Sequence, residues 1–317
     1  MNTGIHRGPL LAMIAGAALI STTSVLVKFA HVPPTVSAFW RMLFGGAILG
    51  MALAAMRQWR AVRARDVLWM VAPALAFATD LFFWHRSILD VGPGLATLLG
   101  NLQVFMMALA GVLLHREKLG WRFLVGLAMA FVGLWLLIGQ GWSGFASSYR
   151  TGVLYGAFTA VCYAAYMLSF RHAQRERSTL DSSQLLSIAS LLCAGVLAML
   201  CMADGEPFRI PDAQTWVALV ALGLVGQCLG WVLISRAMPQ LPTSLVGLLL
   251  LLQPVLAFLM DVVLFHRATR TVEWIGLALS LCGIFIGSLR APAPAGRQET
   301  LAEAGVAAGS AADPPGE

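Results

Sequence analysis

The chain has little charge for its length. Only 11% of its 317 residues are Asp, Glu, Lys or Arg, whereas 59% are hydrophobic. Soluble globular domains carry about 25% charged residues. A chain with so few charges cannot cover its hydrophobic residues with a polar surface, so the composition argues against a soluble domain and indicates a membrane protein.

The sequence also lacks the motifs of common enzyme and metal-site classes. It contains no H-E-x-x-H, no G-x-S-x-G, no P-loop and no Cys and His set with zinc spacing. Its five cysteines include no C-x-x-C pair. We therefore expect no enzyme activity, no metal, no cofactor and no ATP-driven transport. The net charge of +6 is attributed to membrane topology and not to nucleic-acid binding.

Apolar residues occur in ten runs that suit transmembrane helices. A helix needs roughly 20 mainly apolar residues to cross a bilayer. The runs do not alternate with period two, so they predict helices and not barrel strands. Pro254 lies inside the ninth run and predicts a kink there. The expected spans are residues 10–29, 35–56, 67–89, 92–114, 119–138, 152–170, 185–202, 215–238, 244–265 and 272–289.

Positive charges are distributed unequally between the two sets of connecting segments. Of the 21 Lys and Arg residues, 14 fall on the side of the N-terminus, 5 on the other side and 2 within spans. Cytoplasmic loops are enriched in Lys and Arg. We therefore expect both termini in the cytoplasm, with Arg60 and Arg175 inside and Trp142 outside. The segment 291–317 has no apolar period and is expected to be a disordered cytoplasmic tail.

The two halves of the chain match each other at a shift of 150 positions. Each half has an odd number of spans, so equivalent spans cross the membrane in opposite senses, as in many transporters. We predict an all-α membrane protein of ten transmembrane helices in two inverted five-helix repeats, residues 9–139 and 149–290. The matched residues are Arg86 and Arg236, Gln103 and Gln253, Gly126-Leu127-Ala128 and Gly276-Leu277-Ala278, and Gly133 and Gly283.

Several local features are shared with a known family. The first span ends near Lys28, the second begins with Phe39-Trp40-Arg41-Met42-Leu43, and the fourth ends in Leu113-Leu114-His115-Arg116-Glu117. Together with the paired hairpins of the fourth and fifth and the ninth and tenth spans, these features resemble the EamA-type permeases of the drug/metabolite transporter superfamily. The second repeat departs from the pattern, with Arg267 where the acid would stand. The resemblance implies export of amino-acid-like or zwitterionic metabolites.

Charged side chains within the spans are candidates for function. Such groups cost at least ~2.5 kcal/mol at a helix centre, so they are expected to be paired or functional. Arg41 and Arg86 could each contact a cavity or extend to the headgroups. Asp80 is the deepest carboxylate, with Lys28 or Arg41 as a partner, and could anchor a substrate amine, carry a coupled proton or form a structural ion pair. Asp261 is expected to be hydrated near its span's outer end.

Polar and aromatic residues near the middle of the spans complete the candidate site. Gln103 and Gln253 fall at equivalent depths, and transporter sites commonly lie near the midplane between repeats. Amides there can donate and accept hydrogen bonds without a fixed charge. The alternative is a helix–helix hydrogen bond worth about 0.6 kcal/mol. Asn101 is expected to point to another face, whereas Tyr163 and Trp84 are expected to reach the cavity.

These features predict a secondary transporter that moves a small polar metabolite across the inner membrane by alternating access. Its partners are the substrate and the lipid bilayer, and a coupled proton and a homodimer are left open. The alternatives are an uptake permease for a metabolite or vitamin, and a non-transporting membrane protein such as an assembly factor. The predicted substrate-binding residues are Gln103, Gln253, Arg41, Asp80, Tyr163 and Trp84.

Overall fold

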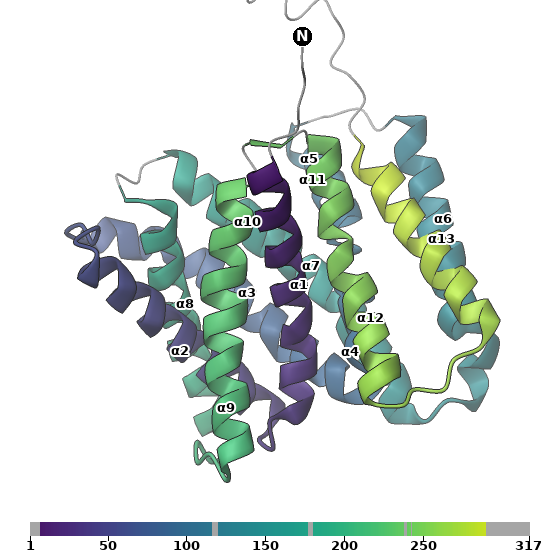
Figure 1. Cartoon of the computed structure of the whole chain (residues 1–317), viewed down its shortest axis with the longest axis horizontal. Coiled ribbons are helices and arrows are strands. Elements are labelled where there is room, and N and C mark those ends of the chain that lie inside the picture. Colours follow the sequence, from purple (N-terminus) through teal and green to yellow (C-terminus); the bar gives the residue numbers. More distant parts are fainter. Residues whose placement is uncertain (1–6, 116–119, 177–179, 238–239, 242, 290–317) are drawn as a thin grey trace, which may run out of the picture.

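The chain folds into helices that stand side by side (Figure 1). The computed structural model describes residues 7–115, 120–176, 180–237, 240–241 and 243–289, and every longer regular element in these ranges is helical. The first half contains α1 (Arg7–Phe29), α2 (Pro34–Ala55), α3 (Ala64–Val91), α4 (Pro93–Gly100), α5 (Gln103–His115), α6 (Trp121–Ile138) and the 3₁₀ helix η1 (Gly139–Gly144). The second half contains α7 (Ser147–Glu176), α8 (Ser182–Ala203), α9 (Ala213–Ala221), the π-helix η2 (Leu222–Gly230), α10 (Trp231–Ala237), α11 (Thr243–Leu250), α12 (Leu252–Leu264) and α13 (Thr271–Ser288).

The helices suit a multi-pass membrane protein. Within the described residues, nine helical stretches are long and apolar enough to cross a membrane, and a shorter apolar stretch covers Leu248–Leu264. Large apolar side chains such as Leu113 and Val217 are exposed, as expected where a protein faces lipid. We call the end where α1 begins the N-terminal face and the other end the opposite face. The predicted tail 291–317 lies outside the described residues.

Two of the expected spans are each broken into two helices. The span 244–265 forms α11 and α12, interrupted at Leu251. This break lies three residues before Pro254, which has no N–H for the carbonyl of Leu250, so the kink predicted at Pro254 appears as a break one turn earlier. The span 92–114 forms α4 and α5, interrupted at Asn101 and Leu102 without any proline. The sequence analysis did not predict this second break.

The expected span 215–238 contains a π-helical segment. It consists of α9, η2 and α10 in direct succession, and η2 packs against α1 and α2. The contact is close at Gly226, where a Cβ atom would touch Thr23 and lie 4.0 Å from the Arg41 Nη2 atom. Segments of π-helix are rare and frequently occur at functional sites. Here the segment itself passes close to the buried Arg41.

The last helices of the two halves, α6 and α13, cross with their backbones in contact. Gly126 lies opposite Gly283, and Gly133 lies opposite Gly276. A Cβ atom on Gly126 would lie 2.5 Å from the carbonyl oxygen of Gly283, which no real side chain tolerates. Small residues allow helices in a membrane to approach this closely. The two contacts exchange with each other when residues are shifted by 150 positions.

The buried apolar residues form two main clusters on either side of the centre. The larger surrounds α4, α6, α12 and α13 and includes Leu95, Phe105 and Phe258. The second joins α2, α3, α7 and α8 and includes Met42 and Leu197. Trp84, which lines the cavity described next, packs against both clusters.

Candidate substrate-binding cavity

A cavity of about 380 Å³ lies between the helices of the two halves. Residues of α1 to α5 line it from the first half, and residues of α7 and α10 to α13 line it from the second half. The cavity therefore lies at the junction of the two halves, where transporter sites are commonly found. Its lining includes every predicted site residue: Arg41, Asp80, Trp84, Gln103, Tyr163 and Gln253. Their contact with a substrate remains a prediction.

One wall of the cavity carries two opposite charges, Arg41 on α2 and Asp80 on α3. Arg41 is only 5% exposed and Asp80 only 4%. In the structure, the Nε and Nη1 atoms of Arg41 and the Oδ1 atom of Asp80 have no hydrogen-bond partner. The two groups interact electrostatically, yet the ion pairs within 4 Å among the described residues do not include them. Buried polar atoms without partners are costly, so this wall is suited to a ligand with complementary charges.

Amide side chains line the cavity at the two helix breaks. Gln103 is the first residue of α5, and Gln253 is the second residue of α12. The buried Oε1 atom of Gln103 has no hydrogen-bond partner. Asn101 also lines the cavity, and its amide nitrogen donates to the carbonyl oxygen of Thr97 at 2.8 Å. The prediction that Asn101 points to another face was wrong, because it assumed a continuous helix.

Aromatic and aliphatic side chains form the rest of the lining. The ring of Trp84 lies 5.2 Å from the guanidinium carbon of Arg41. Phe77 and Tyr163 face each other with ring centroids 6.3 Å apart. Ile234, Val246 and other aliphatic residues continue the lining. The cavity therefore combines two charged side chains and several neutral polar ones with a mainly aromatic and aliphatic lining.

The second arginine within a span, Arg86, is half-buried and has its partners within the protein. Its Nη1 atom donates to the carbonyl oxygen of Phe82 at 3.1 Å, and its Nη2 atom donates to the hydroxyl of Thr35 at 2.9 Å. Its guanidinium carbon also lies 3.5 Å from the centroid of the Phe82 ring. Arg86 is not part of the cavity lining. Of the two arginines that the sequence left open, Arg41 is therefore the one that reaches the cavity.

Asp261 and Lys28 form an ion pair outside the cavity. Asp261 is 1% exposed, and its Oδ1 atom lies 3.8 Å from the Lys28 Nζ atom. Its Oδ2 atom lies 3.4 Å from the Nη1 atom of Arg267. The prediction of a hydrated Asp261 was wrong, because α12 packs Asp261 against α1 and α4. Lys28 therefore pairs with Asp261 and not with Asp80.

Comparison with known proteins identifies the family. The model of the EamA-like transporter family matches residues 7–139 and 150–289 of the chain. The chain belongs to the EamA-like transporter family. It is therefore a transporter of the membrane, as its apolar helices and its central cavity indicate.

Curated relatives and a solved structure agree with this family. The chain is 28% identical over 212 residues to the aromatic amino acid exporter YddG of Ancylobacter novellus, covering 66% of this chain and 72% of the relative. It is 24% identical over 243 residues to an uncharacterized transporter of Haemophilus influenzae, covering 72% and 76%. A crystal structure with 23% identity matches with a TM-score of 0.61, covering 88% of this chain and 97% of the other. This last likeness shows a shared fold.

Proposed function

We propose that this EamA-family chain is a secondary transporter that exports small zwitterionic, amino-acid-like metabolites across the inner membrane by alternating access. The observation that carries the proposal is the wall formed by Arg41 and Asp80, where two guanidinium nitrogens and one carboxylate oxygen are buried without partners. A guanidinium binds a carboxylate through two parallel hydrogen bonds, and a carboxylate binds an ammonium group. A compound with both groups would complement both residues. Export is proposed from the likeness to the exporter YddG.

The remaining lining residues suit the rest of such a substrate. Trp84 and Tyr163 provide aromatic contacts beside the charged wall. Gln103 and Gln253 stand at the two helix breaks and provide hydrogen bonds from both halves. The aliphatic lining beyond them favours a substrate whose side chain is apolar. A coupled proton, if one is used, would be carried by Asp80.

The proposed transport mechanism includes ten membrane crossings in two inverted repeats. Three observations support the repeats. A shift of 150 positions moves α4 onto the bounds of α11 and nearly superposes α5 on α12. The same shift exchanges the two glycine contacts between α6 and α13. At the centre of that crossing the hydroxyl of Ser280 donates to the carbonyl oxygen of its equivalent, Ala130, at 3.1 Å. Both termini are then on the cytoplasmic side.

Binding to the purified full-length chain in detergent tests the substrate class. An amino acid with an apolar side chain, its decarboxylated amine and its deaminated acid would be compared by ligand-induced thermal shift. The amino acid should stabilise the protein most. Arg41→Lys should weaken its binding about tenfold or more, because a bond to a charged group contributes ~1.5–3 kcal/mol and lysine lacks the planar fork.

Arg86→Lys is the matched control, since Arg86 is also an arginine within a span, half-buried and hydrogen-bonded, but does not line the cavity. Its affinity for the amino acid should stay unchanged even if its thermal stability falls. Equal stabilisation by the amine and the amino acid, or normal affinity in Arg41→Lys, would contradict the proposed recognition of a zwitterion.

A further inference from the structure

We propose that Asp261, held by Lys28 and Arg267, is the lock that keeps the cavity closed at the opposite face and is released in each transport cycle. The proposal rests on the alternating access proposed above. It goes beyond the binding site, because none of the three residues lines the cavity. Four features of the structure carry it.

The first feature is the direction in which the cavity extends. Besides the charged wall, its lining includes Met167, Ile234, Val246 and Ser288, which lie in the parts of their helices nearer the N-terminal face. Toward the opposite face, buried apolar side chains such as Val27, Leu95 and Phe258 pack together. The cavity is therefore separated from the opposite face by side chains and helices that must move before a substrate can leave there.

The second feature is an asymmetry between equivalent helices. Near the opposite face α4 packs directly on α12, and a Cβ atom on Gly94 would lie 2.5 Å from the Phe258 Cα atom. The 150-residue shift relates this pair to α11 and α5. Within the described residues no comparable packing joins α5 to α11, and both line the cavity through Val104 and Val246. The pair α4 and α12, which we call the gate at the opposite face, is therefore closed, whereas the equivalent pair α11 and α5 is separated.

The third feature is the ionic cluster at the closed gate. Lys28 lies in the last turn of α1 in the first half and Asp261 belongs to the second half, so their ion pair joins the halves. Arg267 pairs with Asp261 and with Glu273 within the second half. Gly92, which precedes α4, has φ +90° and leaves no room for a Cβ atom beside the Asp261 carboxylate. The Asp261 carboxylate thus lies between α1, α4 and α12, and these helices must separate for the gate to open.

The fourth feature is the aromatic cover of this cluster. The Lys28 Nζ atom lies 4.0 Å from the centroid of the Phe265 ring, and the guanidinium carbon of Arg267 lies 5.1 Å from that of Phe258. The Asp261 side chain is only 2% exposed. Removing one partner of a buried ion pair is strongly destabilising, whereas exposed pairs contribute little. The cluster can therefore hold the gate closed.

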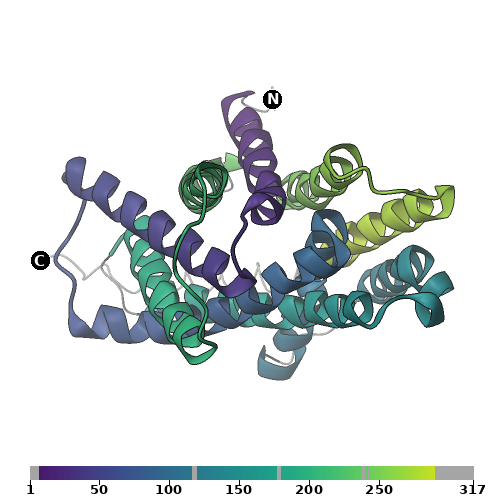
Figure 2. The ribbon, with the colours of Figure 1, turned by 90° about the horizontal axis from the view of Figure 1, so that it is seen from below.

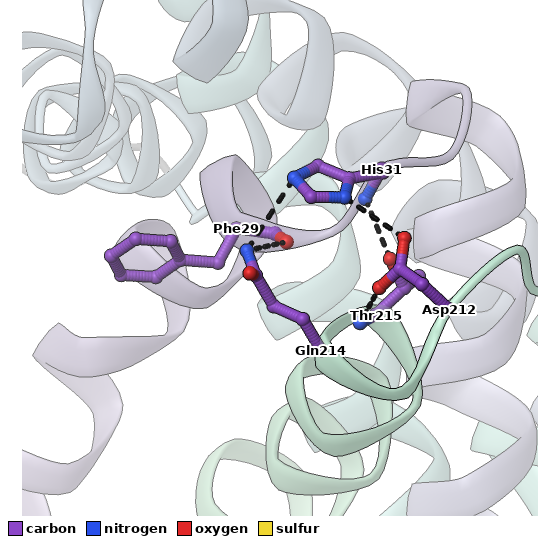
Figure 3. A network of polar contacts seen from close by, with 5 residues as sticks. All are labelled: Phe29, His31, Asp212, Gln214 and Thr215. Carbon is purple, nitrogen blue, oxygen red and sulfur yellow. Dashed lines mark hydrogen bonds and ion pairs between the residues drawn. The ribbon is translucent and has the colours of Figure 1, made fainter.

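A second polar network at the same face is too exposed for this role. His31, in the turn after α1, donates its backbone N–H to the Thr215 hydroxyl at 3.0 Å and places its Nδ1 atom 2.9 Å from Asp212 (Figure 3). Gln214 donates to the Phe29 carbonyl oxygen at 3.2 Å. The side chain of His31 is 57% exposed. The network joins the end of α1 to the start of α9. In the view from this face (Figure 2), the ribbons of α9 and α12 lie on different sides of α1.

The test measures access to a buried position behind the lock. Leu95 on α4 is fully buried in the apolar cluster shared with Phe258. Leu95→Cys would be introduced into the full chain after replacement of its five native cysteines, and its reaction with a maleimide would be timed in detergent without substrate. Asp261→Asn should raise the rate about tenfold, because it removes the charge that pairs with Lys28 across the halves and leaves Arg267 with Glu273 alone, while keeping the size of the side chain. Asp212→Asn, the same change in the exposed network, should leave it unchanged.

Each outcome decides the proposal. A rate that stays the same in folded Asp261→Asn, or rises equally in Asp212→Asn, would overturn the lock. Should Asp261→Asn not fold, Lys28→Met would be used, because it removes only one of the two cations. Its labelling rate must also rise, though by less than the tenfold expected for Asp261→Asn. Labelling needs no substrate. A chain that binds no amino acid but shows the rise therefore overturns the substrate proposal alone, and a chain that binds amino acids without the rise overturns the lock alone.

Discussion

Replacement of Gln103 by leucine separates a substrate contact from a packing role, because the two roles predict opposite changes. Leucine is similar in size and has no polar atoms. The Oε1 atom of Gln103 is buried and has no hydrogen-bond partner in the protein. Removing this oxygen breaks no hydrogen bond within the protein. It also removes the cost of a buried acceptor without a partner, which is about 1–3 kcal/mol. The stability of Gln103→Leu should therefore be unchanged or higher.

Substrate affinity should change in the other direction. A neutral hydrogen bond contributes about 0.5–1.5 kcal/mol, which corresponds to a loss of roughly two- to thirteenfold in affinity. Gln253→Leu removes the equivalent amide of the second half and should weaken binding by a similar factor. The double variant should lose transport while its amount in the membrane stays normal.

The assay measures both quantities on the same purified protein, as a melting temperature without substrate and as an affinity with it. Gln184→Leu is the control. Gln184 is fully buried in α8 and does not line the cavity; its amide nitrogen donates to the Arg60 carbonyl oxygen at 2.7 Å, and its amide oxygen accepts from the Arg60 backbone N–H at 3.1 Å. It should lose stability and keep its affinity. If Gln103→Leu behaves like this control, the amide serves helix packing and the reasoning is refuted.

Three further predictions follow from the charges. A cysteine at position 60 should react with an impermeant reagent only in opened cells, and one at position 142 in intact cells; the reverse pattern would reverse the proposed topology. Asp80→Asn should weaken binding of an amino acid more than binding of its deaminated acid. If Asp80 instead carries a coupled proton, counterflow exchange should survive and pH-driven accumulation should be lost. The backbone N–H of Thr215, and then the side chain of His31, lower the pKa of Asp212. A lowered carboxylate pKa stabilises the fold above the ordinary aspartate pKa, and this stabilisation is lost as the pH falls through the folded pKa. Asp212→Asn should therefore lose less thermal stability between about pH 7 and about pH 3 than the unchanged chain.

The helices could be predicted from the sequence because lipid leaves few alternatives. A run of about 20 apolar residues must satisfy its backbone internally, so α1, α2, α3, α6, α8 and α13 begin and end near their expected residues. The break between α4 and α5 was missed because neither proline nor charge marks it. The signal was available in the 150-residue repeat, since Pro254 predicts an interruption in the ninth span and Asn101 stands at the position equivalent to Leu251 there.

The location of the predicted site residues followed from depth and burial cost, but the partners of the charges did not. Arg41, Asp80 and the two amides all lie well within their spans, and all four line one cavity. Lys28 pairs with Asp261, although the chain separates them by more than 200 positions. Depth gave no means to prefer this partner over Asp80. Only the packing of α1 against α12, which joins the two halves, decides between them.

The glycine contact between α6 and α13 makes each half of the chain behave like a subunit of a heterodimer. Each of these helices ends its half, and its glycine face admits no side chain where the other backbone lies. Alone, either half would expose to lipid a strip of bare backbone that only the other half covers. A chain cut within the loop between Ile138 and Ser147 should therefore reassemble when both pieces are made together, whereas one piece alone would lack its partner.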